Sequence, residues 1–392
     1  MPVWVSQLRI GRAGFKANAR RMADGLAEVR LLKARVVAES AAKFEQRGQL
    51  LPRERGARRL DRGGVFLERS ALAGLRLHDD DGKKSVLGGG SIVGIGSVSG
   101  KREPISASDS ALKGGTVLPM GLRKGLRAQA IAAENKRPPI YRVESGGANQ
   151  MHPNEMFVEG GRAFANQARL SAAGIPQIAV VHGASTAGGA YLPGLSGCVV
   201  LVKGRSSIHL AGLSLVMTAI GEDCSEDELG GSALHAEVSG LGEYLAESDA
   251  HAIALTRELV DKLRWDSVPA SRATAAEPLY APDALPGLVP ADDREPRDVR
   301  EVIARLVDGS DCLEFKAPFA AETVCGHVSL GGHEVGILGN IGAIQPIGST
   351  KTAQFIQRCD QRDTPLASCK PPPATGWAAQ PRAAAPSITA AR

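Results

Sequence analysis

The chain has 392 residues, 43% of them hydrophobic, and a formal net charge of +5. This length allows two or three domains. No apolar run approaches about eighteen residues and no charged segment leads into a long apolar core at the N-terminus, so we expect neither a membrane span nor a signal peptide. The positive charge gathers at Arg53, Arg55, Arg58 and Arg59 without interleaved aromatic residues. We therefore predict a basic surface that faces a phosphate-bearing small molecule or an acidic partner rather than nucleic acid.

The cysteines are scattered, and no two of them form a Cys-x-x-Cys pair. They are Cys198, Cys224, Cys312, Cys325, Cys359 and Cys369. This spacing argues against a zinc ribbon. It is typical of reduced thiols, so we predict a cytoplasmic protein without a bound metal.

The N-terminal third predicts a long helix, a hairpin and a turn. Residues 16–47 carry apolar side chains at helical spacing, and Pro52 follows the helix. Residues 91–98 and 103–107 predict a hairpin, because their glycines depart from the Gly-x-Gly-x-x-Gly fingerprint of a dinucleotide site. Lys113-Gly-Gly115 precedes a helix predicted over 122–135. This turn is equally typical of a phosphate site and of a solvated loop.

The most informative stretch is an apolar run followed by small residues. Ile175-Pro-Gln-Ile-Ala-Val-Val181 predicts a buried strand, parallel to its neighbours, that leads into Ala187-Gly-Gly-Ala190. A second turn, Ser145-Gly-Gly147, follows another apolar stretch. Glycine turns at the ends of neighbouring strands leave backbone N–H groups free to hold an oxyanion or an enolate. Ser185 lacks the Gly-x-Ser-x-Gly context of a nucleophile elbow, so we do not expect a serine hydrolase.

The later elements continue an α/β layered pattern. We predict strands at 198–202 and 207–211, a structural role for His235, and a long helix over 243–264. The proline-rich stretch 269–297 predicts a linker. Beyond it, Asp298 is expected to cap a helix that ends at Gly309. Strands and a helix over 350–362 follow, and they begin a second α/β half that needs more strands than remain.

Several runs, in order along the chain, resemble the carboxyltransferase (β) subunits of biotin-dependent acyl-CoA carboxylases, in particular the methylcrotonoyl-CoA and geranyl-CoA carboxylase branch. They are Glu144-Ser-Gly-Gly-Ala148, Phe164-Ala-Asn-Gln-Ala168, Ala173-Gly-Ile-Pro-Gln-Ile178, Ser185-Thr-Ala-Gly-Gly-Ala-Tyr191, Glu228-Leu-Gly-Gly231, Asp298-Val-Arg-Glu-Val-Ile-Ala-Arg305 and Thr352-Ala-Gln-Phe-Ile-Gln357. The resemblance covers the chain from about residue 15 to Leu366.

The resemblance implies an α/β fold with a crotonase-like spiral domain at residues 1–268, a linker at 269–297 and a partial second crotonase-like domain at 298–366. It implies transfer of a carboxyl group from carboxybiotin to a 3-methylcrotonoyl-CoA or geranyl-CoA type of substrate, as in leucine or isoprenoid catabolism. The biotin would be carried by a biotin carboxylase/biotin carrier α subunit. The β subunits would form a homo-oligomer, with no metal, membrane or nucleic acid involved.

Site residues follow from the same resemblance. The backbone N–H groups of Gly188, Gly189 and Ala190 would form the catalytic oxyanion hole, each donor contributing about 3 kcal/mol to the transition state. The remaining residues would bind substrate: Gly146, Gly147, Lys113, Gly114, Gly115, Arg300 and Arg305. The acyl group itself stays open.

The C-terminal residues depart from the family pattern. Beyond Leu366, where the family continues with a strand and a Thr-Gly-Tyr turn, residues 367–392 are rich in Ala and Pro and predict a disordered tail. Codons for Ser368–Thr375 can be chosen so that the adjacent frame encodes Phe-Leu-Gln-Thr-Pro-Thr-Gly-Tyr. This suggests a frameshifted chain that lacks the second oxyanion hole and has no carboxylation activity, and reading the gene tests it.

Two other functions stay open at this stage. One is a truncated, non-catalytic remnant that binds acyl-CoA or sister subunits. The other is a stand-alone crotonase-like hydrolase or isomerase, which would need an acidic side chain beside the oxyanion hole.

Overall fold

Two compact units make up the chain: Leu31–Pro269, here called the sheet unit, and Met1–Arg30 with Ala270–Arg392, here called the terminal unit. They are seen in a computed structural model that describes residues 3–78, 86–263, 265, 274–290, 297–342 and 344–369, apart from the side chains of residues 35–40 and 43. Helix α1 (Ala13–Gln46) contributes residues to both units. No helix in the described ranges is both long enough and apolar enough to cross a membrane.

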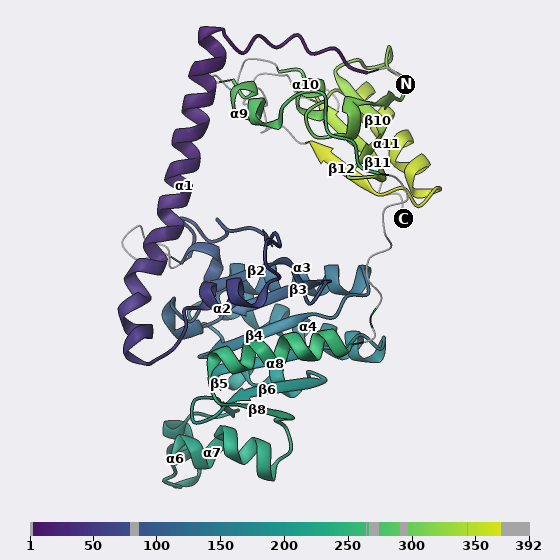
Figure 1. The fold of residues 1–392 in the computed structure, drawn as a ribbon. Coiled ribbons are helices and arrows are strands. Elements are labelled where there is room, and N and C mark those ends of the chain that lie inside the picture. The colour runs from purple at the N-terminus through teal and green to yellow at the C-terminus, as the bar shows by residue number, and fades with distance from the viewer. Residues whose placement is uncertain are drawn as a thin grey trace. The chain divides into compact units, whose positions relative to one another are not determined.

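The sheet unit is built on one sheet whose strands run in the order β1-β2-β3-β4-β5-β6-β8, with β7 paired to β5 (Figure 1). The β2–β3 pair is an antiparallel hairpin, as predicted, and β3 to β6 and β8 are parallel. The strands are β1 (Leu67–Glu68), β2 (Ser91–Val98), β3 (Lys101–Ser108), β4 (Ile140–Ser145), β5 (Ile178–Thr186), β6 (Cys198–Val202), β7 (Ser207–His209) and β8 (Tyr244–Ala246).

Both faces of this sheet are buried, which explains the unbroken apolar runs of its central strands. On β5, Ile178 and Val180 pack into one core cluster with Val260, while Ala179 and Val181 pack into another on the opposite face. The helices are α2 (Pro52–Arg59), α3 (Pro119–Glu134), α4 (Pro153–Ala172), α5 (Tyr191–Gly194), α6 (Leu213–Ile220), α7 (Glu226–Gly230) and α8 (Asp249–Lys262).

The helix predicted over 243–264 begins later than expected. Residues 244–246 form β8, which adds to the parallel sheet beside β6. Ser248 then caps α8, since its side chain accepts a hydrogen bond from the N–H of His251 at 3.2 Å. The prediction placed the helix start too early because β8 has only three residues, too few to show a strand pattern before the helix begins.

The terminal unit contains a second sheet in the order β12-β11-β10-β9. Its helices and strands are α9 (Leu285–Leu288), α10 (Val299–Ile303), β9 (Leu313–Glu314), β10 (Thr323–Leu330), β11 (His333–Asn340), α11 (Pro346–Asp360) and β12 (Leu366–Cys369). The first residues of the chain belong to this unit, whereas the sequence prediction assigned them to the domain 1–268. Trp4 packs against its apolar core, and the hydroxyl of Ser6 donates to Glu301 at 2.6 Å.

The predicted tail and linker fall partly on described residues. Ala367 to Cys369 pair in parallel with β11, so the last strand runs three residues into the predicted tail 367–392, and the rest of that tail lies outside the described residues. Of the predicted linker 269–297, residues 274–290 are described and include a 3-10 turn, Pro282–Ala284, and α9. The remainder, except residue 297, lies outside the described residues.

Candidate functional site

A cavity of about 460 Å³ lies in the sheet unit, at the ends of β4 and β5 and against α3 and α4. Its walls are mainly glycine, alanine and apolar side chains, among them Leu122 and Leu126 of α3 and Met156, Phe157 and Phe164 of α4. Among the described residues that line it there is no carboxylate, histidine, lysine or arginine. The cavity can therefore hold an apolar group, and the polar side chains among its described lining residues are those of serine, glutamine and tyrosine.

Two glycine turns form one rim of this cavity, as the sequence predicts. β4 and β5 pair in parallel with Ser145 opposite Ser185, so the chain leaves both strands at the same edge. The turns touch: a Cβ added at Gly189 would lie 2.9 Å from the Cβ of Ser145, and one added at Gly147 would lie 3.4 Å from the Cβ of Ala187. Glycine is needed at these two positions because the turns approach so closely.

The turn after β5 presents backbone donors. The N–H groups of Gly188 and Gly189 find no acceptor among the residues that the structure describes, whereas the N–H of Ala190 donates to the carbonyl of Ala187 at 3.0 Å. Of the three donors predicted for the oxyanion hole, the two glycines are thus the available ones. Ala187 holds a φ of 51°, a left-handed conformation that costs a non-glycine residue about 1–2 kcal/mol. Such strain at a cavity rim is typical of a functional turn.

The turn after β4 supplies a further unengaged donor. The N–H of Gly147 donates to the hydroxyl of Ser145 at 3.2 Å, while the N–H of Gly146 has no acceptor within the described part of the chain. Ser185 is fully buried, and its hydroxyl donates to the carbonyl of Gly189 at 2.9 Å. That bond fixes the donor turn and leaves Ser185 in no position to act as a nucleophile.

The other residues predicted to bind substrate divide between the two units. Gly115 lines the cavity, but Lys113 and Gly114, the left-handed residues before it, do not. Arg300 and Arg305 belong to the terminal unit, where each makes ion pairs: Arg300 with Glu314 at 2.8 Å, and Arg305, only 3% exposed, with Glu301 at 2.7 Å. Their role in binding stays a prediction.

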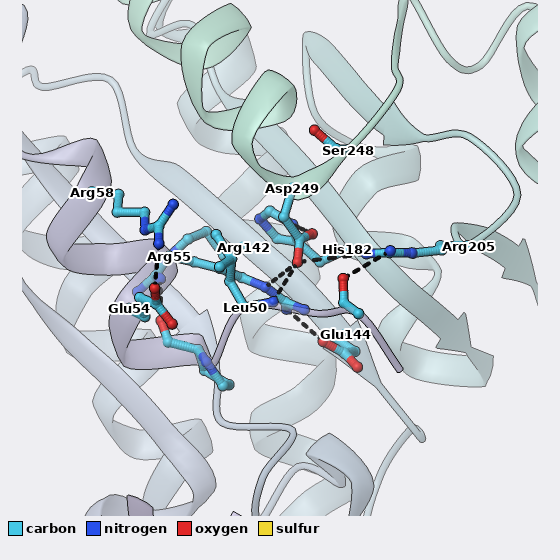
Figure 2. A network of polar contacts seen from close by, with 12 residues as sticks. Leu50, Glu54, Arg55, Arg58, Arg142, Glu144, His182, Arg205, Ser248 and Asp249 are labelled. Atoms are coloured by element: carbon cyan, nitrogen blue, oxygen red, sulfur yellow. Dashed lines mark hydrogen bonds and ion pairs between the residues drawn. The ribbon is translucent and has the colours of Figure 1, made fainter. Parts of the chain in front are cut away.

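A buried polar network lies behind the glycine turns, and the sequence alone did not indicate it. Figure 2 shows Asp249 of α8 between Arg55 of α2, His182 of β5 and Arg205. The Asp249 carboxylate is 2.8 Å from Nδ1 of His182 and 3.2 Å from Nε of Arg55, and Nη1 of Arg55 is 2.6 Å from Glu144. The network connects α2 and α8 to β4, the strand that leads into the Ser145-Gly146-Gly147 turn.

Burial and neighbouring charges set the protonation of this network. Burial lowers the pKa of His182 to about 3; its bond to Asp249 opposes this, and the charge of Arg55 adds to it. His182 is therefore neutral at pH 7 and donates its Nδ1–H to Asp249. Burial raises the pKa of Asp249, but the bond from His182 and the charge of Arg55 outweigh burial and lower it to about 2. The pair is thus a neutral imidazole on a carboxylate, a structural arrangement within the sheet unit.

The predicted basic surface at residues 53–59 needs a correction. Arg58 is exposed and pairs with Glu54, but Arg55 and Arg59 are 2% and 0% exposed. They lie one turn apart on α2, so both face the sheet and α8 rather than solvent. In the described part of the chain, no group of three or more His, Cys, Asp or Glu side chains is placed to hold a metal ion.

The fold and site define a class: an α/β protein in which two glycine turns present backbone N–H groups at the rim of a mainly apolar cavity. The chain belongs to the carboxyl transferase family, since the family model described as "Carboxyl transferase domain" matches residues 43–369. Its fold is the crotonase-like fold of carboxyltransferases.

Two curated relatives and one solved structure are similar to the chain over most of its length. The chain is 43% identical over 362 residues to the mitochondrial methylcrotonoyl-CoA carboxylase beta chain of Dictyostelium discoideum, covering 90% of this chain but 61% of that protein. It is 43% identical over 366 residues to a probable biotin-dependent acyl-coenzyme A carboxylase beta2 subunit of Mycobacterium tuberculosis, with coverages of 92% and 68%. Among solved structures, the beta subunit of Pseudomonas aeruginosa geranyl-CoA carboxylase is 50% identical with a TM-score of 0.84, covering 94% of this chain and 70% of that one.

Proposed function

We propose that the chain is the acyl-CoA-binding part of a carboxyltransferase that moves a carboxyl group from carboxybiotin to a branched enoyl-CoA. The observation that carries the proposal is the cavity: free glycine N–H groups stand at its rim, and no carboxylate, histidine or lysine stands among its described lining residues. An enolate can be stabilised there, but the base that takes up the proton must arrive with another molecule.

A biotin-dependent reaction meets this requirement. In the proposed step a C–H bond at the γ carbon of the enoyl group breaks and a C–C bond to the carboxyl carbon forms. The N–C bond of the carboxybiotin breaks, and its ureido nitrogen accepts the proton. The chain's own contribution is to hold the thioester oxygen with the N–H groups of Gly188 and Gly189, and to exclude water with the apolar walls. Biotin would be carried by an α partner, and the β chains would assemble with copies of themselves in the cytoplasm.

The same observation disfavours a crotonase-like hydrolase or isomerase acting alone, because such an enzyme needs an acidic side chain at the rim. A non-catalytic acyl-CoA-binding protein remains the second candidate. Turnover separates it from a carboxyltransferase, since both would bind the thioester.

We further propose that the acyl group is long, of the geranyl type. Helix α4 places Gly160 and Gly161 in the cavity wall, in the middle of the helix. Each costs about 1 kcal/mol relative to alanine there, and nothing lies within 4 Å of a Cβ added at either position. The sequence thus keeps space open where side chains would favour the helix. The named relatives include both a methylcrotonoyl-CoA and a geranyl-CoA carboxylase subunit.

Calorimetry with geranyl-CoA and methylcrotonoyl-CoA tests the binding step. We expect wild type to bind geranyl-CoA, and Gly160→Leu, which fills the open wall, to lose about ten-fold or more in affinity for it while retaining methylcrotonoyl-CoA. Gly25→Leu is the matched control, because Gly25 also lies in a helix with nothing within 4 Å of its Cβ. Equal geranyl-CoA affinity in Gly160→Leu and wild type would remove the assignment of this cavity.

Fixation of labelled bicarbonate into geranyl-CoA, with ATP and the biotin-carrying α subunit of a geranyl-CoA carboxylase, tests the transfer step. Label in the thioester product supports a carboxyltransferase. Thioester binding without any label in the product supports the non-catalytic alternative.

A further inference from the structure

A group of buried arginines lies beside β4, away from the acyl cavity. Arg55 and Arg59 of α2 and Arg142 of β4 are 2%, 0% and 5% exposed, and Arg53 stands at the edge of the group. Figure 2 shows Arg55 and Arg142 in the same interior region. Arginine keeps its charge in proteins, and buried charges need partners.

The nearby carboxylates form ion pairs with some of these arginines but not with all of them. Arg55 is paired with Glu144 and Asp249, and Arg53 with Glu68 at 3.0 Å. Arg142, however, donates only to the carbonyl of Pro52, at 2.5 Å, and its Nε has no acceptor among the described residues. The three guanidinium nitrogens of Arg59 likewise have none within the described ranges.

The pKa values of Arg142 and Arg59 also indicate that nearby carboxylates do not fully offset the positive charge of this group. Burial and then the charge of Arg55 lower the pKa of Arg142 to about 9. Burial, followed by the charges of Arg142 and Arg55, lowers the pKa of Arg59 as well. Asp109 is buried and opposes this effect at Arg142, but the two form no ion pair within 4.0 Å. The arginines thus carry more positive charge than the described carboxylates in contact with them offset.

A second cavity, of about 130 Å³, opens onto these side chains. Arg53 and Arg142 supply its polar groups, and apolar residues make up the other walls: Ala57, Leu60, Phe66, Ile92 and Ile105. Gly56 keeps it open, because a Cβ at that position would lie 3.1 Å from Nη2 of Arg142. A buried guanidinium that donates to the carbonyl of Pro52, and that has no carboxylate within ion-pair distance among the described residues, therefore faces a small cavity whose walls, apart from the two arginines, are apolar.

We propose that this second cavity binds a small monovalent anion, held by Arg142 and Arg53. A water molecule could accept a hydrogen bond from the Arg142 guanidinium, but it would not offset the charge, whereas an anion does both. The guanidinium fork suits halides and small planar oxyanions. Bound there, the anion links α2 to β4 two residues before Glu144, and so stabilises the strand that carries the Ser145-Gly146-Gly147 turn. This inference does not depend on the proposed reaction.

Thermal unfolding of the full chain tests the anion site. Sodium chloride is titrated against sodium gluconate at constant ionic strength, since gluconate is too large for the cavity. We expect chloride to raise the Tm saturably by about 3–6 °C. Gly56→Val places methyl groups in the cavity, and the atoms nearest to the added Cβ are the terminal guanidinium atoms of Arg142, so this variant should fold and lose the chloride effect. Arg142→Met should lose it too, while Arg127→Met, at a side chain 54% exposed, should keep it.

Crystals grown in bromide give an independent readout, and anomalous scattering should place a bromide within about 3.5 Å of the Arg142 guanidinium. A chloride effect that persists unchanged in Gly56→Val would overturn the proposal. So would the absence of both a chloride effect and a bromide peak in wild type.

Discussion

His182 should make the stability of the sheet unit depend on pH in a way that can be isolated. Its pKa is about 3 in the folded chain, against an ordinary value of 6.5, because burial disfavours the imidazolium ion. A folded pKa below the unfolded one means that this stability is present above pH 6.5 and is lost as pH falls toward 3. Each pH unit in that window costs about 1.4 kcal/mol, so a drop from pH 6.5 to pH 5 removes about 2 kcal/mol.

Two other buried groups decide how the measurement must be made. The depressed pKa of Asp249 matters only below its ordinary value of 3.8, outside this window. Glu103 acts in the window but with the opposite sign: burial raises its pKa from 4.5 to about 8, so its contribution is full below 4.5 and is lost as pH rises through 8. The wild-type curve alone can therefore look flat, and the informative quantity is the difference between wild type and a His182 variant.

Urea unfolding of wild type and His182→Gln at pH 7, 6.5, 6, 5.5 and 5 gives that difference. Glutamine can still donate to Asp249 but does not titrate. We expect the stability gap between the two proteins to close by about 2 kcal/mol from pH 6.5 to pH 5. Val181→Ala, at the fully buried neighbouring residue, is the control, because it leaves a cavity without a titrating group. A gap that stays constant in His182→Gln, as in the control, would refute the account of a neutral, buried His182.

Four further substitutions test the donor turn and the cap of α8. Gly189→Ala places a Cβ 2.9 Å from that of Ser145 and should lower stability by about 1–3 kcal/mol, whereas Gly188→Ala, whose nearest atom is 3.9 Å away, should fold normally and bind geranyl-CoA more weakly in calorimetry. Ala187→Gly relieves the left-handed φ of 51° and should raise the Tm by about 2–4 °C. Ser248→Ala should cost about 1 kcal/mol in urea unfolding.

The parallel core of the sheet unit could be predicted because its local signals agree. β4, β5 and β6 are short apolar runs, and glycine turns follow the first two, so strand, turn and neighbour could be placed from the sequence. The same logic predicted the paired turns at the cavity rim. Which N–H groups stay free could not be predicted, because the bond from Ala190 to Ala187 depends on the tight 3-10 turn.

Helix α4 is the main element that the sequence alone did not indicate. Gly160 and Gly161 weaken the helix signal in the sequence, because glycine is a poor helix former. Both residues lie in the wall of the cavity, where they leave space open. Local propensity and global structure disagree at such places, and functional sites are where that disagreement is expected.

The sequence also did not indicate that these charged side chains are buried. The helix that carries Arg55 and Arg59 is rich in charged residues, which is typical of a solvent-exposed helix. Asp249 lies 67 residues from His182 in the chain. Only the packing of α2 and α8 against the sheet turns these residues into an interior network. His182 is the one signal that the sequence offers, since a polar side chain directly follows the apolar run Ile178-Ala-Val-Val181.

The crystal structure of the chain with bound geranyl-CoA tests the central claim most directly. We expect the acyl group in the cavity between α3 and α4, with the thioester oxygen about 2.7–3.2 Å from the backbone nitrogens of Gly188 and Gly189. A thioester oxygen bound away from this turn, or an acyl group outside the cavity, would contradict it.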